Sequence, residues 1–206
     1  MFDLVSGALR ASLVTFALCG FAYPLAVTAL GQWLMPFQAN GSLVMDARGT
    51  VLGSELIGQQ WNDPQWFHGR PSATTDADPN DATRTIPAPY NAASSGASNL
   101  GPTSKELEDR LLGAWKALDD AEPEATKNML PADMLTASAS GLDPDISPAS
   151  AFLQVNRVAK ARGVTPDGVS ALVKRRITPR TFGVFGEPRV NVLQLNLALD
   201  REFPMR

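Results

Sequence analysis

The chain has 206 residues, a formal net charge of −3 and a charged fraction of only 19%. A chain of this length has room for one domain with accessory segments, and its charge gives no sign of a nucleic-acid-binding surface. The single cysteine, Cys19, excludes an intramolecular disulfide and a cysteine-based zinc cluster. His68 is the only histidine, so a histidine-rich metal site or a Ser-His-Asp triad has almost no residues to draw on.

A long uncharged stretch near the N-terminus is the main compositional feature of the chain. No charged residue occurs between Ala11 and Met45. About twenty residues of helix, rising about 1.5 Å each, span roughly 30 Å, which is the hydrocarbon thickness of a bilayer. Arg10 gives a weak positive-inside bias, so we expect the short N-terminal end to stay in the cytoplasm. The predicted segments are a cytoplasmic N-terminus (1–10), a transmembrane helix (11–35) and an extracytoplasmic domain (36–206).

A cleaved signal peptide is the alternative interpretation of this stretch. Ala29-Leu30-Gly31 could serve as its small-residue cleavage site. The apolar part of a signal peptide is normally about 7–15 residues long, which is shorter than the stretch present here. A lipoprotein signal is excluded because Leu18, and not a small residue, precedes Cys19. A permanent membrane anchor is therefore the favoured prediction.

The predicted membrane helix carries features of a helix that packs against another helix. Tyr23 places a phenol near the middle of the span, where it needs a hydrogen-bond acceptor, and Pro24 removes one backbone donor. Ala22, Ala26 and Ala29 form a stripe of small residues at helical spacing, which lets a second helix approach closely. These five residues are the candidate contacts with a membrane partner. Alanine and proline are also simply common in membrane helices.

Short β-prone runs follow the helix. Residues 43–45 and 50–52 flank Asp46-Ala47-Arg48-Gly49, a pattern that predicts a β-hairpin. The aromatic and irregular stretch after this hairpin contains His68 and Arg70. These two residues either bind an anion or are ordinary loop residues.

A polar segment and an acidic helix come next. Residues 73–104 lack apolar periodicity, so we expect a long loop that either clasps a partner or is a disordered insertion. Ser104 begins a predicted helix, which Glu122-Pro123-Glu124 ends. Its acidic residues are interpreted as a solvated face. Its predicted apolar face consists of Leu107, Leu111, Leu112, Trp115 and Leu118.

Two predicted helices follow, each with a clear start signal. Ser147-Pro148 and Thr165-Pro166 both place a capping side chain before a proline at the first helical position. The first helix is expected to run to Gly163 and the second to Arg176. This pair carries basic side chains, which either contact anionic lipid headgroups or an acidic subunit surface, or form a solvated face that the acidic helix partly neutralises. These side chains are Arg157, Lys160, Arg162, Lys174, Arg175 and Arg176.

The C-terminal stretch "RVNVLQLNLALD" alternates between apolar and polar residues. Its leucines occupy positions 193, 195, 197 and 199, which predicts a half-buried strand. The expected fold class is therefore a single transmembrane α-helix plus an extracytoplasmic α+β domain with a small sheet.

Common motifs of catalysis and cofactor binding are absent from the sequence. It contains no G-x-x-x-x-G-K-[ST] phosphate loop, no G-x-G-x-x-G opening a helix and no H-E-x-x-H. Asp143-Pro144-Asp145 resembles the start of a calcium loop but lacks the later glycine and glutamate. Ser138-Ala139-Ser140-Gly141 is a serine-rich turn with no histidine nearby in the sequence. We therefore expect no metal site and no catalytic residue.

Seven blocks of the sequence, in this order, point to one family. They are "YPLAVTALGQWLMPFQANGSL", "GSELIGQ", "FHGRPSA", "SSGASNLGP", "LTASASGLDPDISP", "RVAKARGV" and "VNVLQLNLALD". From Tyr23 to Asp200 they resemble the C subunit of the bacterial Kdp potassium-transporting P-type ATPase. The family's usual S-G-G-S-N is S-G-A-S-N here, with alanine at position 97 between Gly96 and Asn99, which is a minor departure.

This resemblance implies an accessory subunit of a high-affinity, ATP-driven potassium uptake complex in the bacterial inner membrane. Members of the family join a channel-like potassium-selective subunit, a P-type ATPase pump subunit and a small membrane peptide. Potassium is then carried by a partner subunit. The family is also described as a catalytic chaperone that raises the ATP affinity of the pump subunit. The residues to which the resemblance assigns ATP are Gln154, Ser138, Ser140 and Gly141.

An ATP site conflicts with the predicted topology, because ATP is scarce outside the cytoplasm. We therefore expect the domain to brace the complex and to cover the outer side of the potassium-selective subunit through polar loops at 72–102 and 137–148. The candidate partner contacts in and beside these loops are Arg70, Asn99 and Asp143. An ATP-affinity chaperone and a membrane-anchored extracytoplasmic enzyme are the two alternative functions.

Overall fold

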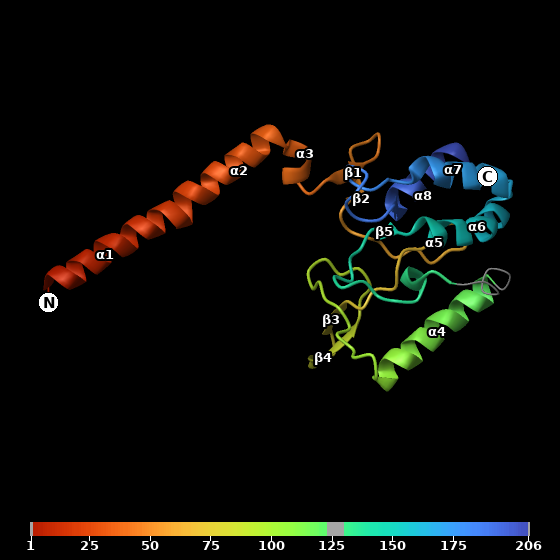
Figure 1. Cartoon of the computed structure of the whole chain (residues 1–206), viewed down its shortest axis with the longest axis horizontal. Coiled ribbons are helices and arrows are strands. Elements are labelled where there is room, and N and C mark those ends of the chain that lie inside the picture. The colour runs from red at the N-terminus through yellow and green to blue at the C-terminus, as the bar shows by residue number, and fades with distance from the viewer. Residues whose placement is uncertain (1, 123–129, 206) are drawn as a thin grey trace. The chain divides into compact units, whose positions relative to one another are not determined.

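The computed structural model describes residues 2–122 and 130–205 (Figure 1). The chain divides into two compact units, Met1–Leu52 and Gly53–Arg206. Helices dominate both units, and the strands of the described residues form three separate two-stranded sheets. The predicted combination of one apolar helix with further helices and small sheets is confirmed.

A continuous apolar helix forms most of the first unit. It consists of α1 (Phe2–Ala17), a π-helical turn (Leu18–Ala22) and α2 (Tyr23–Leu34). Among the described residues it is the one helix that is long and apolar enough to cross a membrane, with 33 residues and a mean hydropathy of 1.9. None of its most apolar stretch is buried within the chain. The helix starts at Phe2, so the residues before Ala11 are helical as well.

Pro24 explains the irregular turn in the middle of this helix. A proline has no N–H for the carbonyl four residues earlier, here that of Gly20, and its ring crowds that carbonyl. The backbone N–H of Tyr23 bonds instead to the carbonyl of Leu18, five residues back, which is π-helical spacing. The wider turn relieves the crowding and leaves the helix continuous.

The predicted hairpin follows the apolar helix. A short helix, α3 (Pro36–Ala39), leads into β1 (Leu43–Met45) and β2 (Val51–Ser54), which pair with each other. The carboxylate of Asp46 accepts bonds from the backbone N–H groups two and four residues later, both at 2.8 Å. An aspartate that bonds its own backbone in this way stabilises a tight turn, and the hairpin prediction is confirmed.

A second hairpin lies inside the segment that the sequence predicts as a long loop. β3 (Thr75–Asp78) pairs antiparallel with β4 (Asp81–Pro87). The carboxylate of Asp78 accepts a bond of 2.8 Å from the backbone N–H of Asn80 in the turn between them. The prediction of an unbroken loop over 73–104 was wrong, because these strands are polar and mostly exposed and therefore lack the apolar alternation that reveals a strand.

The acidic helix α4 (Lys105–Ala121) begins directly after Ser104, as predicted. None of its residues is fully buried, and Leu112 and Trp115 are 58% and 44% exposed. The predicted apolar face is therefore only partly covered by the rest of the chain. Pro123-Glu124, part of the predicted helix end, lies outside the described residues.

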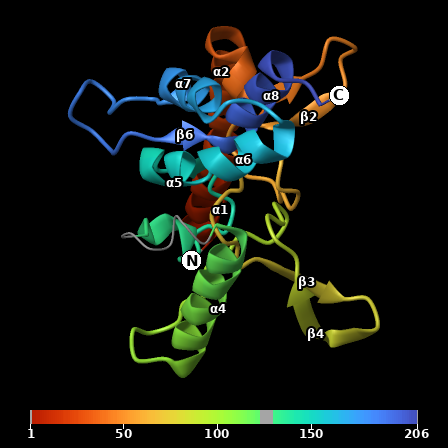
Figure 2. The same ribbon diagram turned by 90° about the vertical axis from the view of Figure 1, so that its right-hand side faces the viewer.

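Four helices pack together in the second unit (Figure 2). They are α5 (Pro148–Leu153), α6 (Val155–Arg162), α7 (Pro166–Arg176) and α8 (Val192–Glu202). A 3-10 turn (Ala132–Met134) precedes them, and β5 (Asp145–Ile146) pairs antiparallel with β6 (Val190–Asn191).

Local capping fixes the ends of these helices where the sequence predicts them. The hydroxyl of Ser147 accepts a bond of 3.1 Å from the N–H of Ser150, and Thr165 caps α7 in the same way at 3.4 Å. Gly163 ends α6 with φ +66°, a left-handed conformation that glycine adopts readily. One prediction was wrong: the single helix expected up to Gly163 is divided at Gln154, whose side chain bonds to backbone outside the helix.

The C-terminal segment forms the helix α8 and not the predicted strand. Only Val190 and Asn191 are extended, and the side chain of Asn191 caps the helix by accepting a bond of 3.0 Å from the N–H of Gln194. The prediction was wrong because residues 192, 195, 196 and 199 also follow the i, i+3, i+4, i+7 spacing of one helical face, and all four are buried, whereas Leu197 of the alternating leucines is only half-buried. The buried residues of α8 are Val192, Leu193, Leu195, Asn196, Ala198 and Leu199.

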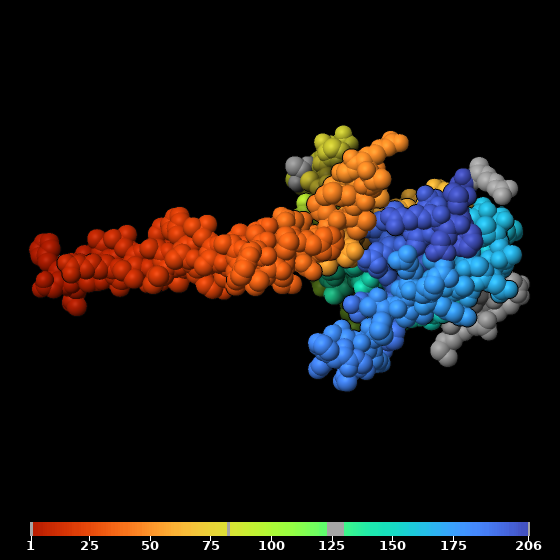
Figure 3. Space-filling model, turned by 90° about the horizontal axis from the view of Figure 1, so that it is seen from above, coloured from red at the N-terminus to blue at the C-terminus, as the bar shows by residue number. Residues whose placement is uncertain are grey.

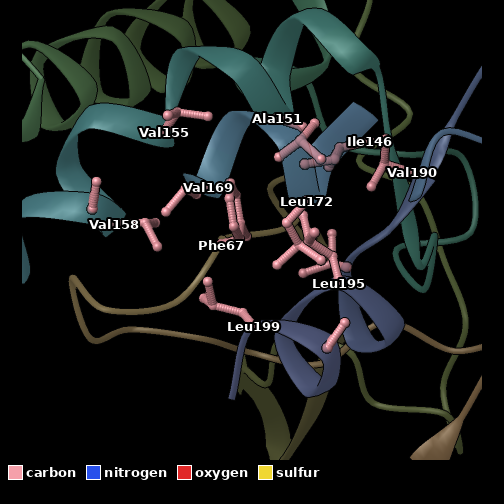
Figure 4. Close-up of a cluster of buried hydrophobic side chains, with 14 residues drawn as sticks. Phe67, Ile146, Ala151, Val155, Val158, Val169, Leu172, Val190, Leu195 and Leu199 are labelled. Carbon is pink, nitrogen blue, oxygen red and sulfur yellow. The ribbon is translucent and has the colours of Figure 1, made fainter. Parts of the chain in front are cut away.

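Phe67 lies at the centre of the core although it belongs to no helix or strand. Its side chain is 0% exposed and lies among Val169, Leu172 and Leu199 in Figure 4. The side chain of Asn196, also 0% exposed, holds it there. The Asn196 carbonyl oxygen accepts a bond from the Phe67 N–H and its amide nitrogen donates to the Phe67 carbonyl, both at 2.9 Å.

We expect Asn196→Leu to destabilise the second unit although leucine suits an apolar core. The change leaves the N–H and C=O of Phe67 buried without partners, which together should cost about 2–4 kcal/mol. Chemical denaturation of the full-length chain in detergent, followed by tryptophan fluorescence, measures this loss. Arg201→Ala, at an exposed position of the same helix, is the control and should change stability by less than about 0.5 kcal/mol. Equal stability of the two variants would contradict the role assigned to Asn196.

Candidate functional site

The polar loops of the second unit meet in one cluster. We define the loop cluster as residues 68–74, 88–96 and 138–143. The carbonyl of Ser140 accepts bonds from the backbone N–H of Gly96 and from the hydroxyl of Ser95, both at 2.9 Å. Gly141 has φ +68°, and a Cβ atom at this position would lie 2.8 Å from the carbonyl oxygen of Gly96. The close approach of the two loops therefore requires glycine.

Ser72 connects the remaining parts of the loop cluster. Its hydroxyl donates to the carbonyl of Gly141 at 2.7 Å and accepts from the N–H of Tyr90 at 3.0 Å. The Tyr90 hydroxyl donates to the carbonyl of Arg70 at 2.6 Å. Burial, and then the negative charge of Asp143, raise the pKa of Tyr90 to about 12, so this hydroxyl stays protonated and keeps donating.

Two of the three predicted partner contacts in the loops lie together. Arg70 and Asp143 form an ion pair of 2.9 Å with side chains 24% and 30% exposed. The charge of Arg70 is thereby already matched, which argues against the anion site considered for Arg70 and His68. Asn99 is exposed and has φ +52°, and its amide makes a long bond of 3.4 Å to the carbonyl of Ala97.

The two aspartates at residues 143–145, which resemble the start of a calcium-binding loop, both form ion pairs with arginines. Asp143 binds Arg70, and Asp145 binds Arg189 at 3.0 Å. The carboxylate of Asp143 also accepts a bond of 3.1 Å from the N–H of Asp145. Across residues 2–122 and 130–205, no group of three or more His, Cys, Asp or Glu side chains is arranged to hold a metal ion.

A cleft of about 430 Å³ separates one face of α4 from the loops of the second unit. The α4 wall carries Ala114, Ala117, Leu118 and Ala121, and the opposite wall carries Trp61, His68, Arg70, Tyr90, Gln154 and Arg157. Gln154 is the only one of the four residues assigned to ATP that lines this cleft in the described part of the chain. Ser138 is 6% exposed, and the serine turn around it packs against residues 95–96 and Ser72.

The side chain of Gln154 uses all of its hydrogen-bonding capacity inside the protein. Its oxygen accepts from the N–H of His68 at 2.8 Å and from Arg157 at 2.6 Å. Its nitrogen donates to the carbonyls of His68 at 3.1 Å and Ser150 at 3.2 Å. An amide oxygen has two lone pairs and an amide nitrogen two hydrogens, so these four bonds saturate the group. Gln154 therefore has a structural role in the cleft wall, where it holds the backbone of His68 and the side chain of Arg157 in place.

Arg157 links α6 to the end of α4 through a buried ion pair. Its Nε atom lies 2.9 Å from Oε1 of Glu122, and the side chains are 10% and 5% exposed. Its Nη1 atom donates to the carbonyls of Pro64 and Trp66 at 2.6 and 3.0 Å. Burial raises the pKa of Glu122, and the hydrogen bond and charge of Arg157 oppose that rise. At Glu122 the prediction of a solvated acidic face was wrong, because a pair of residues so distant in sequence leaves no local pattern.

Sequence reasoning missed Asp133, which organises the start of α5. Its carboxylate accepts bonds from the N–H and hydroxyl of Ser147, at 2.7 and 3.1 Å, and from the hydroxyl of Ser150 at 2.7 Å. Ser147 followed by proline predicts the helix start but says nothing of this third partner. Only the folded chain brings the carboxylate to the cap.

Comparison with known proteins identifies the family of the chain. A family model described as K+-transporting ATPase, c chain (KdpC), matches residues 5–201. The chain belongs to this family. The potassium-transporting ATPase KdpC subunit of Bradyrhizobium diazoefficiens is 56% identical over 189 residues, 92% of each chain. The KdpC subunit of Rhodopseudomonas palustris strain BisB5 is 52% identical over 200 residues, 97% of this chain and 98% of the relative. The KdpC resemblance found in the sequence blocks is thus confirmed.

We expect His68 to titrate below the ordinary histidine range. Burial, and then the positive charge of Arg157, lower its pKa from 6.5, so the folded state favours the neutral ring. The stability that this preference contributes is complete above about pH 6.5 and is lost as the pH falls through the lowered pKa. Because His68 is the only histidine, NMR of histidine-labelled full-length chain gives its pKa without ambiguity.

The linked stability is measured by denaturation of the wild-type chain and of His68→Gln between about pH 7.5 and pH 5. The wild type should lose stability relative to the variant as the pH falls. A pKa at or above 6.5, or parallel stability curves, would contradict the prediction.

Proposed function

We propose that this protein is a single-pass accessory subunit of a potassium-transporting ATPase complex and that it acts by docking and not by catalysis. The observation that carries the proposal is the match over nearly the whole chain to subunits named for that ATPase. In this role potassium passes through a channel-like potassium-selective subunit, and ATP is hydrolysed by a P-type pump subunit. A small membrane peptide completes the complex.

The apolar helix supports a membrane contact with these partners. Ala22, Ala26 and Ala29 are exposed along one side of the helix, where small side chains permit close packing of a second helix. Tyr23 is 69% exposed, and its hydroxyl has no hydrogen bond to any described residue. In a hydrocarbon environment such a hydroxyl needs an acceptor, which a neighbouring membrane helix supplies.

The loop cluster supports the docking role of the second unit. Its loops are bonded to one another through Ser72, Ser140 and Gly141, so they are ordered before any partner binds. Preorganised loops lose little conformational entropy on binding, which favours affinity. We propose that this surface, with Asn99 and the Arg70–Asp143 pair, covers the outer side of the potassium-selective subunit and braces the complex.

The alternative of a nucleotide-binding chaperone receives less support from the cleft. Gln154 is saturated by bonds within the protein, and binding of a nucleotide to its amide would first have to break one of them. Ser138 and Gly141 are buried in the loop cluster. A chaperone role in which this chain contacts ATP directly therefore requires a rearrangement of both regions.

The helix contact is tested by small-to-large substitution on the alanine stripe. The double variant Ala22→Leu, Ala26→Leu should reduce recovery of the complex by about tenfold, because bulky side chains hold two helices apart at a cost of roughly 1–2 kcal/mol. Recovery is measured by co-purification with the larger membrane subunits. Thr28→Leu, on a side of the helix that faces away from both the alanine stripe and Tyr23, is the control and should leave recovery unchanged. Equal recovery of both variants would rule out this stripe as the contact.

The location of the second unit is the other part of the proposal. We expect the second unit on the extracytoplasmic side of the inner membrane, because Arg10 precedes the uncharged stretch and favours a cytoplasmic N-terminus. In a Cys19→Ala background, Ser94→Cys provides an exposed thiol whose backbone bonds are unaffected. A membrane-impermeant maleimide should label it in intact spheroplasts. Ser6→Cys, in the N-terminal turn of α1, should be labelled only after lysis, and the reverse pattern would place the second unit in the cytoplasm.

A further inference from the structure

The loop between α7 and β6 projects from the second unit and exposes apolar side chains at its tip. We call residues 178–189 the finger. In Figure 2 it extends away from the helices, and in Figure 3 it forms the blue lobe at the lower edge of the molecule. Phe182, Val184 and Phe185 are 90%, 70% and 67% exposed. Single apolar residues on a surface are ordinary, but three within one turn form a patch that points to a partner.

The finger is held in a defined conformation by its own backbone. Thr178 and Arg189 exchange two hydrogen bonds of 2.8 and 3.0 Å at its base. Thr181 and Phe185 exchange two further bonds of 2.9 Å close to the tip. These bonds keep the apolar side chains of the tip directed away from the core of the unit.

Phe182 adopts a backbone conformation that is unfavourable for a bulky residue. Its φ is +53°, in the left-handed region that Gly, Asn and Asp occupy most easily. Gly183, the next residue, also has a positive φ of +74°. A strained aromatic residue that is almost fully exposed adds nothing to the packing of its own chain. Such exceptions to local rules are concentrated at functional sites.

Cationic residues surround the finger. Residues 174–189 contain five Lys or Arg residues and one Glu, in a chain whose net charge is −3. Three of the arginines form ion pairs. Lys174 and Arg176 are exposed and form no ion pair with any described residue. An apolar tip with cations at its base fits a bilayer surface that carries anionic headgroups.

We propose that the finger inserts its tip into the interfacial region of an anionic lipid bilayer, as a second membrane contact in addition to the N-terminal helix. Phe182, Val184 and Phe185 enter the boundary between headgroups and acyl chains, and Lys174 and Arg176 bind lipid phosphates.

The size of the tip favours lipid over protein as its partner. A specific protein interface buries about 800 Å² on each side and involves roughly 20–30 residues, far more than this tip offers. Interfacial insertion needs only a few apolar side chains and nearby positive charge. The apolar helix also keeps the chain at a bilayer, which raises the effective concentration of lipid around the finger.

The test places an environment-sensitive fluorophore at the tip in the full-length chain. In a Cys19→Ala background, Val184→Cys is labelled with a nitrobenzoxadiazole group. The chain is reconstituted alone into nanodiscs of phosphatidylcholine with about one third phosphatidylglycerol. We expect quenching by lipids that carry a spin label in the acyl chain, and protection from aqueous iodide. Asn80→Cys, in the exposed polar turn between β3 and β4, is the matched control and should show the reverse.

Two further variants, made in the Val184→Cys chain, separate lipid contact from folding. Phe182→Asn removes the apolar ring and introduces a residue that tolerates positive φ, so lipid contact should be lost while thermal stability is unchanged or higher. Lys174→Gln combined with Arg176→Gln should lower the ratio of inserted to free finger by about fivefold per cation. Nanodiscs of pure phosphatidylcholine should produce a comparable loss.

Equal access of iodide to residue 184 and to residue 80 would overturn the proposal. Protection of residue 184 only in the presence of the larger membrane subunits would assign the finger to a protein partner, and would overturn it as well. A nanodisc offers lipid on both of its faces, so these outcomes do not depend on the orientation proposed above for the second unit.

Discussion

Two buried amide side chains hold the irregular segment on which the second unit is built. Asn196 both donates to and accepts from the backbone of Phe67, and Gln154 does the same for His68. A segment without secondary structure can enter a core only if its backbone groups find partners. Here side chains from α8 and from the junction of α5 and α6 take the place of a neighbouring strand. Each group left unpaired would cost about 1–3 kcal/mol, a large part of a net stability of roughly 5–15 kcal/mol.

The candidate site is an outward extension of this anchored segment. Beyond His68 the chain leaves the core and enters the loop cluster, where Ser72 bonds to Gly141. In the adjoining cleft, Arg157 joins the same segment to Glu122 at the end of α4 and also bonds to Gln154. The cleft and the loop cluster thus share one support, which gives the proposed docking surface a fixed shape.

The helix ends could be predicted because capping interactions form between residues close together in the sequence. The contacts between distant segments could not be predicted in this way. Ser147, Thr165 and Gly163 act within one turn of the chain, so their positions alone identify caps and stops. Asn196 stands at a position that the alternating pattern assigns to solvent, yet it is fully buried because its partner is Phe67, distant in sequence. The pairs of Arg70 with Asp143 and of Arg157 with Glu122 are of the same kind. The sequence predicts the polar character of these loops, but their connections arise only from tertiary packing.

Positive φ angles in the second unit occur at positions that serve folding and also at the exposed tip of the finger. Gly141 and Gly163 use the left-handed region where a close approach or a helix end requires it. Phe182 uses it at the tip of the finger, where no packing within the chain offsets the strain. A domain joined to a bilayer at one point keeps rotational freedom about that point, and a second contact removes much of it. If the finger binds lipid as proposed, it limits the orientations of the loop cluster before any partner subunit arrives, and this lowers the entropic cost of docking.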